Sequence, residues 1–68
     1  METSARNQLP GTVKAVSIGA VMAEIIVDVD GIDVVATITK DSAERLALAD
    51  GMSVTAIIKA TDVMIGVG

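Results

Sequence analysis

The chain contains no cysteine, histidine, phenylalanine, tyrosine or tryptophan, and it has a single proline, Pro10. Without cysteine, no disulfide can staple the fold and no thiolate can bind a metal. Without histidine, the commonest general base and the commonest ligand of transition metals are both missing. Without aromatic rings, there is no stacking platform for single-stranded nucleic acid. Several common kinds of catalytic, metal and nucleic-acid site are therefore ruled out.

The charge balance and the lack of long hydrophobic runs narrow the function further. Nine acidic residues against five basic ones give a formal net charge of −4, whereas nucleic-acid binding depends on neutralising phosphates with lysine and arginine. No apolar run approaches the roughly 18 residues of a membrane-spanning helix. Residues 1–4 are polar and acidic, unlike a signal peptide. We therefore expect a cytoplasmic protein that binds neither nucleic acid nor a membrane.

The core has to be built from small aliphatic side chains. Hydrophobic residues make up 51% of the 68 positions, and the mean hydropathy is +0.65. A chain of this length forms one domain, residues 1–68, which buries only a modest fraction of its surface. Ile26, Val35 and Ile57 occupy outward positions that so small a domain cannot cover. We therefore expect other copies of the chain to cover them in a homo-oligomer.

Alternation of apolar and polar residues predicts the second, third and fourth strands, while a β-branched run and an apolar run predict the first and the last. Strands are expected over residues 12–18, 21–30, 32–39, 52–59 and 63–68. Asp30-Gly31 predicts a type I′ hairpin turn between the second and third of them. The last expected strand is apolar on both faces, which indicates that a partner subunit covers one face.

A short helix is expected between the third and fourth strands. Asp41 followed by Glu44 three residues later fits a capping box, with Asp41 as the N-cap. The helix should continue through Leu48, and Gly51 can adopt the left-handed conformation that ends it. The order of elements predicts an all-β fold, a small five-stranded OB-like barrel with one short helix between strands 3 and 4.

Two short polar segments near opposite ends of the chain carry the residue types that bind an oxyanion. They comprise Thr3, Ser4, Ala5 and Arg6, and then Lys59, Ala60 and Thr61. The guanidinium of Arg6 offers a planar fork of donors, and Lys59 adds an ammonium. Hydroxyl groups and consecutive backbone N–H groups can supply further donors around an anion. We therefore predict a site for a tetrahedral oxyanion.

The same segments carry a family resemblance. Ser4-Ala5-Arg6-Asn7, with Gly11 four residues later, and Lys59-Ala60-Thr61 closely resemble the molbindins, the small molybdenum-pterin-binding (Mop) proteins. The module is also similar to the TOBE-type domain of molybdate-responsive regulators and molybdate transporter ATPases. The resemblance covers the whole chain. It implies a cytoplasmic protein with an OB-like fold that binds molybdate or tungstate, for storage or homeostasis.

The resemblance also implies an assembly and two classes of site. The assembly is a homohexamer, built as a trimer of dimers, with the anions held between subunits. One class of site would combine residues 4–6 of one chain with residues 59–61 of another. A second class lies near symmetry axes, and Gly19 and Ala20 are weak candidates for it, since a simple turn is the favoured explanation of these two residues. Ala60 stands where some relatives have serine, so only its backbone amide can contribute.

Other functions have weaker support in the residues. Glu24 and Asp28 could provide acid–base carboxylates, but no nucleophile or orienting partner accompanies them, so we do not expect an enzyme. The aspartates do not have the spacing of an EF-hand loop. A self-association module without a ligand is the alternative that stays open, and it leaves Arg6 and Lys59 without a role. The sequence also leaves open whether the protein stores, buffers or delivers the anion, and whether it binds a pterin.

Overall fold

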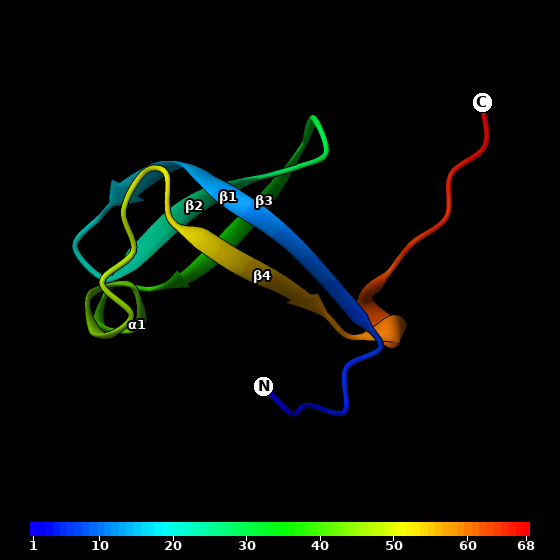
Figure 1. Cartoon of the computed structure of the whole chain (residues 1–68), viewed down its shortest axis with the longest axis horizontal. Coiled ribbons are helices and arrows are strands. Elements are labelled where there is room, and N and C mark those ends of the chain that lie inside the picture. The colour runs from blue at the N-terminus through cyan, green and yellow to red at the C-terminus, as the bar shows by residue number, and fades with distance from the viewer.

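The computed structural model describes all 68 residues. One antiparallel sheet with the strand order β3-β2-β1-β4 forms most of the molecule (Figure 1). Its strands are β1 (Asn7–Ile18), β2 (Met22–Val29), β3 (Ile32–Thr39) and β4 (Ser53–Ile58). The helix α1 (Lys40–Arg45) connects β3 to β4, and the 3-10 turn η1 (Ala60–Asp62) follows β4. No helix has the length and apolar character needed to cross a membrane.

The prediction of a small all-β domain with a helix between the third and fourth strands is confirmed. The prediction of a fifth strand is wrong. Residues 63–68 belong to no strand and extend away from the sheet (Figure 1). The sheet is therefore open, with β3 and β4 as its two edges, and the predicted five-stranded barrel does not form within one chain. The apolar character of this segment was sufficient for a strand prediction, but a strand also needs a neighbour to pair with.

The strand β1 is longer than expected and runs through both halves of the sheet. It begins at Asn7, five residues before the predicted start, and includes Pro10. Residues 7–12 pair with β4, and residues 12–18 pair with β2. A bulge between Val13 and Ala15 shifts the register within the part that pairs with β2. Residues 7–11 pair on one side only, and a strand tolerates proline where one edge is free.

The hairpin between β2 and β3 confirms the turn prediction. Asp30 and Gly31 have φ angles of 50° and 86°, and a type I′ turn requires positive φ at both central residues. The turn is closed further by the carboxylate of Asp28, which accepts a hydrogen bond from the Gly31 N–H at 2.9 Å. The strand registers follow directly, with Val29 opposite Ile32.

The helix differs from the prediction at both ends. Thr39 is the N-cap instead of Asp41, and its Oγ1 accepts a hydrogen bond from the Ser42 N–H at 3.1 Å. The helix ends at Arg45 and does not continue to Leu48, because Ala47 has the left-handed φ of 53°. Gly51, with φ of 85°, lies in the later turn before β4.

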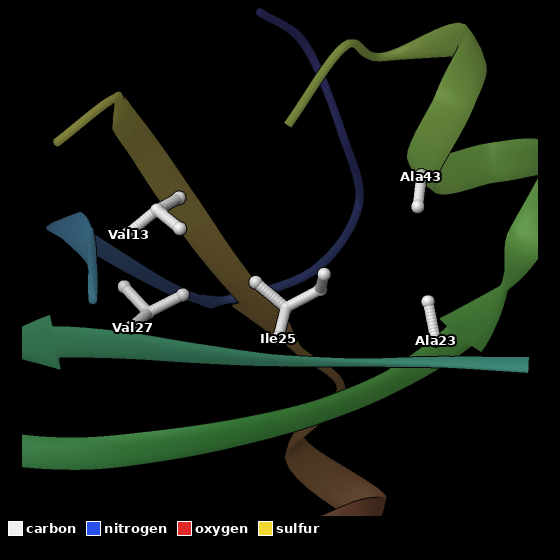
Figure 2. Close-up of a cluster of buried hydrophobic side chains, with 5 residues drawn as sticks. All are labelled: Val13, Ala23, Ile25, Val27 and Ala43. Atoms are coloured by element: carbon white, nitrogen blue, oxygen red, sulfur yellow. The ribbon is translucent and has the colours of Figure 1, made fainter. Parts of the chain in front are cut away.

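The core is small and lies on one face of the sheet. Only five residues are buried: Val13, Ala23, Ile25, Val27 and Ala43. Ala43 of α1 points toward Ala23 of β2, while the other three side chains gather beside β4 (Figure 2). Many large apolar side chains stay exposed, including Val35 at 58% and Ile57 at 46%. Two of the three outward positions named from the sequence are thus exposed, and Ile26 is half-buried.

Candidate functional site

The ladder between β1 and β4 brings the two polar segments together. Asn7 lies opposite Ile58 at the end of this ladder, so Arg6 precedes one strand and Lys59 follows the other at the same edge of the sheet. A depression of about 300 Å³ forms there. Its lining consists of Ser4, Ala5, Arg6, Lys59, Ala60 and Thr61. Six of the seven residues predicted for the oxyanion site therefore meet in one place.

The charges of the depression are all positive. Arg6 and Lys59 make no ion pair, since the salt bridges of the molecule join Lys14 to Asp33 and Lys40 to Glu44. No acidic side chain lines the depression. In a chain of net charge −4, two unpaired cations side by side create a local field that favours an anion.

Hydrogen bonds shape the N-terminal side of the depression. The Ala5 N–H donates to Oγ1 of Thr3 at 3.2 Å, and Nε2 of Gln8 donates to the Ala5 carbonyl oxygen at 2.9 Å. Thr3 is therefore the predicted residue that the structure leaves out, because its hydroxyl turns to its own backbone and it does not line the depression. The same hydrogen bond occupies the Ala5 amide.

The C-terminal side of the depression is formed by the turn η1. The Asp62 N–H donates to the Lys59 carbonyl oxygen at 2.9 Å, and this hydrogen bond closes the turn. The N–H groups of Ala60 and Thr61 begin the turn and have no acceptor within it. They are therefore available as backbone donors, next to the hydroxyl of Thr61. Ala60 contributes only its backbone, as expected.

A role for Asn7 was not predicted from the sequence. Its Nδ2 donates a hydrogen bond to the carbonyl oxygen of Ile58 at 3.2 Å. Asn7 follows Arg6 and Ile58 precedes Lys59, so this hydrogen bond holds the two polar segments together at the edge of the depression. The sequence signal was a polar residue immediately after the arginine, but its partner could be identified only from the β1–β4 register. The two segments meet within a single chain, so a second chain is not needed to bring them together.

Gly19 and Ala20 lie at the other end of β1, away from this depression. They form the turn between β1 and β2, in which the Gly19 N–H donates to the Met22 carbonyl oxygen at 2.8 Å. A side chain on Gly19 would bring its Cβ to 2.9 Å from that same oxygen, so the tight turn explains the glycine. Neither residue lines a depression in the chain.

The fold and the site together define a small antiparallel β-domain with a cationic depression between its two polar segments. Residues 3–65 match the model of the TOBE domain. The chain is 50% identical over 66 residues to molybdenum-pterin-binding protein 3 of Clostridium pasteurianum, a match covering 96% of this chain and 97% of that protein. The chain therefore belongs to the TOBE domain family, among the small molybdenum-pterin-binding (Mop) proteins.

Solved structures agree with this assignment. A molybdate-binding protein from Sporomusa ovata has a TM-score of 0.91 at 46% identity, covering 96% of this chain and 97% of that one. The cytoplasmic molybdate-binding protein ModG, with molybdate bound, has a TM-score of 0.93 at 40% identity. It covers all of this chain, which in turn spans 49% of ModG. The domain thus occurs both alone and as part of a longer chain.

Proposed function

We propose that the chain binds molybdate, or tungstate, in the depression between residues 4–6 and 59–61. The observation that carries this proposal is the pair of unpaired cations, Arg6 and Lys59, in a depression without any carboxylate. The names of the relatives, which are molybdenum-pterin-binding and molybdate-binding proteins, support the same choice of anion.

The depression offers the groups that a tetrahedral dianion requires. Such an ion has four acceptor oxygens and no proton to donate. The Arg6 guanidinium can hold two oxygens with parallel N–H donors, and Lys59 contributes a second positive charge. The hydroxyl groups of Ser4 and Thr61 can rotate so that they donate hydrogen bonds to the anion. The backbone N–H groups at the start of η1 are further donors, so every group assigned to the anion donates.

This donor set predicts the selectivity of the site. Near neutral pH phosphate carries a proton that needs an acceptor, so a shell made up of donors disfavours it. Sulfate has the same charge and shape as molybdate and is smaller, so only the size of the pocket can separate the two. The donor set thus disfavours phosphate, while the preference for molybdate over sulfate rests on the molybdate-binding relatives.

We further propose that the chain acts as a homo-oligomer in the cytoplasm, where it stores molybdate and buffers its concentration. The resemblance to the molbindins implies a homohexamer with anions held between subunits. The depression supports a shared site because Ser4, Arg6 and all three of its residues 59–61 are exposed. A partner subunit could cover this open side and remove the anion from water.

The proposal is tested by the melting temperature of the purified chain in molybdate, tungstate, sulfate and phosphate. A ligand that binds only the folded state stabilises it by mass action, so the first two anions should raise the melting temperature at concentrations where the others do not. Equal effects of all four would show a non-specific salt response. No shift with any anion would leave self-association without a ligand as the function, which the exposed apolar side chains favour.

A further inference from the structure

The segment that precedes β1 carries three of the residues lining the depression, and few contacts hold it in place. Residues 4–6 lie outside every strand and make no backbone–backbone hydrogen bond. One side-chain hydrogen bond joins them to the sheet, from Nε2 of Gln8 to the Ala5 carbonyl oxygen at 2.9 Å. The hydrogen bond between Thr3 and Ala5 stays within the N-terminal segment itself. Gln8 is therefore the side chain that anchors this segment to β1.

Gln8 is held by the sheet but contacts the segment outside it. It is the second residue of β1 and lies opposite Ile57 in the ladder with β4. Its side chain is exposed and reaches back three residues along the chain. Only the NH2 end of its amide can make the contact, because a backbone carbonyl oxygen accepts hydrogen bonds and does not donate them. Gln8 does not line the depression, so it touches the site only through the backbone of Ala5.

This hydrogen bond fixes the direction of one peptide group. The Ala5 carbonyl oxygen and the Arg6 N–H belong to the same planar trans peptide, so they point in opposite directions. Gln8 binds the oxygen, whereas the Arg6 N–H has no acceptor within the chain. Both Ala5 and Arg6 line the depression. The peptide therefore brings an unpaired backbone donor to the place where the Arg6 side chain begins.

We propose that Gln8 is a positioning residue of the anion site, which turns the Ala5 carbonyl oxygen away from the bound anion and the Arg6 N–H toward it. This inference rests on the anion binding in the proposed function. Molybdate has only acceptor oxygens, so a carbonyl oxygen turned toward it repels it, while an N–H donates to it. Rotation of this one peptide group thus exchanges a favourable contact for an unfavourable one.

The direction of the peptide also bears on which anion is preferred. Near neutral pH phosphate carries a proton, which needs an acceptor. While Gln8 holds the Ala5 carbonyl oxygen, that proton finds no acceptor among the groups assigned to the anion. Once the carbonyl oxygen is released, it can turn and accept the proton. Loss of the Gln8 amide should therefore weaken molybdate binding more than phosphate binding.

Gln8→Leu tests this role, because it removes the amide and keeps a side chain of similar size on β1. Thr12→Val is the matched control, since Thr12 is exposed on the same face of β1 and does not line the depression. The Kd for molybdate should rise between about threefold and tenfold in Gln8→Leu, the usual effect of one neutral hydrogen bond. The ratio of the phosphate Kd to the molybdate Kd should fall, and Thr12→Val should change neither quantity.

Titration calorimetry measures the molybdate Kd, and competition against molybdate measures that of phosphate. An unchanged molybdate Kd in Gln8→Leu would overturn the proposal. An equal rise for both anions would also overturn it, because a general loosening of the fold has no reason to favour phosphate.

The amide resonance of Arg6 gives a readout that a purely structural role would not move. In nuclear magnetic resonance spectra of the native chain, the Arg6 backbone amide proton should move downfield at saturating molybdate, because it gains a hydrogen bond to the anion. In Gln8→Leu, at molybdate concentrations that saturate the variant, most of this shift should be lost. If the variant binds more weakly but keeps the full shift, Gln8 only stabilises the fold and the proposal is wrong. If the native Arg6 amide does not respond while molybdate binds, the anion site stands and the role of Gln8 fails; if the native chain binds no molybdate, both fail.

Discussion

Asn7 and Ile58 are directly opposite each other in the β1–β4 ladder, and Nδ2 of Asn7 also donates a hydrogen bond to the Ile58 carbonyl oxygen at 3.2 Å. This pair is the last link between the two strands before Arg6 and Lys59. It therefore holds the two cations at one edge of the sheet, where like charges would otherwise repel each other. The shape of the depression therefore depends on this pair as well as on the residues that line it.

Asn7→Ala should separate the two segments without removing any group from the depression. We expect a loss of about 1 kcal/mol in the free energy of unfolding, the usual net value of one hydrogen bond. Molybdate affinity should fall severalfold, because the donors are held less firmly. Titration calorimetry and thermal unfolding measure the two effects. Unchanged affinity in a destabilised variant would show that Asn7 supports only the fold.

Arg6→Ala should remove the main charged donor of the site. Hydrogen bonds to charged groups contribute about 1.5–3 kcal/mol, so molybdate affinity should fall by roughly one to two orders of magnitude. Arg45→Ala is the matched control, because Arg45 is also exposed and unpaired but lies at the end of α1. It should leave the affinity unchanged. Without anion, both variants should have the same oligomeric state as the native chain; dissociation of Arg6→Ala would make Arg6 a structural residue.

Gly11→Ala should destabilise the fold, although it adds only one methyl group. An added Cβ would come within 2.6 Å of the Asp28 carbonyl oxygen and 2.7 Å of Cγ1 of Val27. A backbone oxygen cannot move aside cheaply, so we expect a loss of roughly 1–3 kcal/mol, as for other overpacked sites. Gly66→Ala is the control, since nothing lies within 4 Å of its Cβ position. Chemical denaturation should separate the two variants, and equal stability would mean that β1 and β2 can move apart at no cost.

Thr39→Ala tests where α1 begins. Loss of its hydroxyl removes the acceptor for the Ser42 N–H and should cost about 1 kcal/mol in the free energy of unfolding. Asp41→Asn keeps the shape of the side chain that the sequence pattern indicated as the cap, and it should cost only about 0.3 kcal/mol through the helix dipole. Urea unfolding of the two variants measures the difference. A larger effect of Asp41→Asn would move the N-cap back to residue 41.

The local features of the fold were predictable because a few adjacent residues determine them. The hairpin at Asp30-Gly31 is an example, since its turn type depends on two residues that accept positive φ. The helix start was wrongly predicted at Asp41, because the capping-box pattern fits that residue, whereas Thr39, where β3 ends, is the N-cap. Ala47 gave no signal that the helix ends there, because alanine favours continuing a helix.

The non-local features could not be derived from the pattern. Residues 63–68 are apolar enough for a strand, but apolar character carries no information about the neighbouring strand. The residue types of Arg6 and Lys59 indicated an anion, whereas their meeting within one chain depends on the register of β1 with β4. Thr3 was included in the predicted site because of its hydroxyl group. Only the structure shows that the Thr3 hydroxyl oxygen accepts a local hydrogen bond from the Ala5 N–H and that Thr3 does not line the depression.

The closeness of the two polar segments has a consequence for how the domain can be joined to others. Residues 4–6 precede the first strand and residues 59–61 follow the last, so both connections to a neighbouring domain begin within a few residues of the depression. An anion bound there would bridge the incoming and the outgoing chain. A domain fused at either side would therefore join this one beside the depression, and not at the opposite end, where Gly19 and Ala20 form the β1–β2 turn.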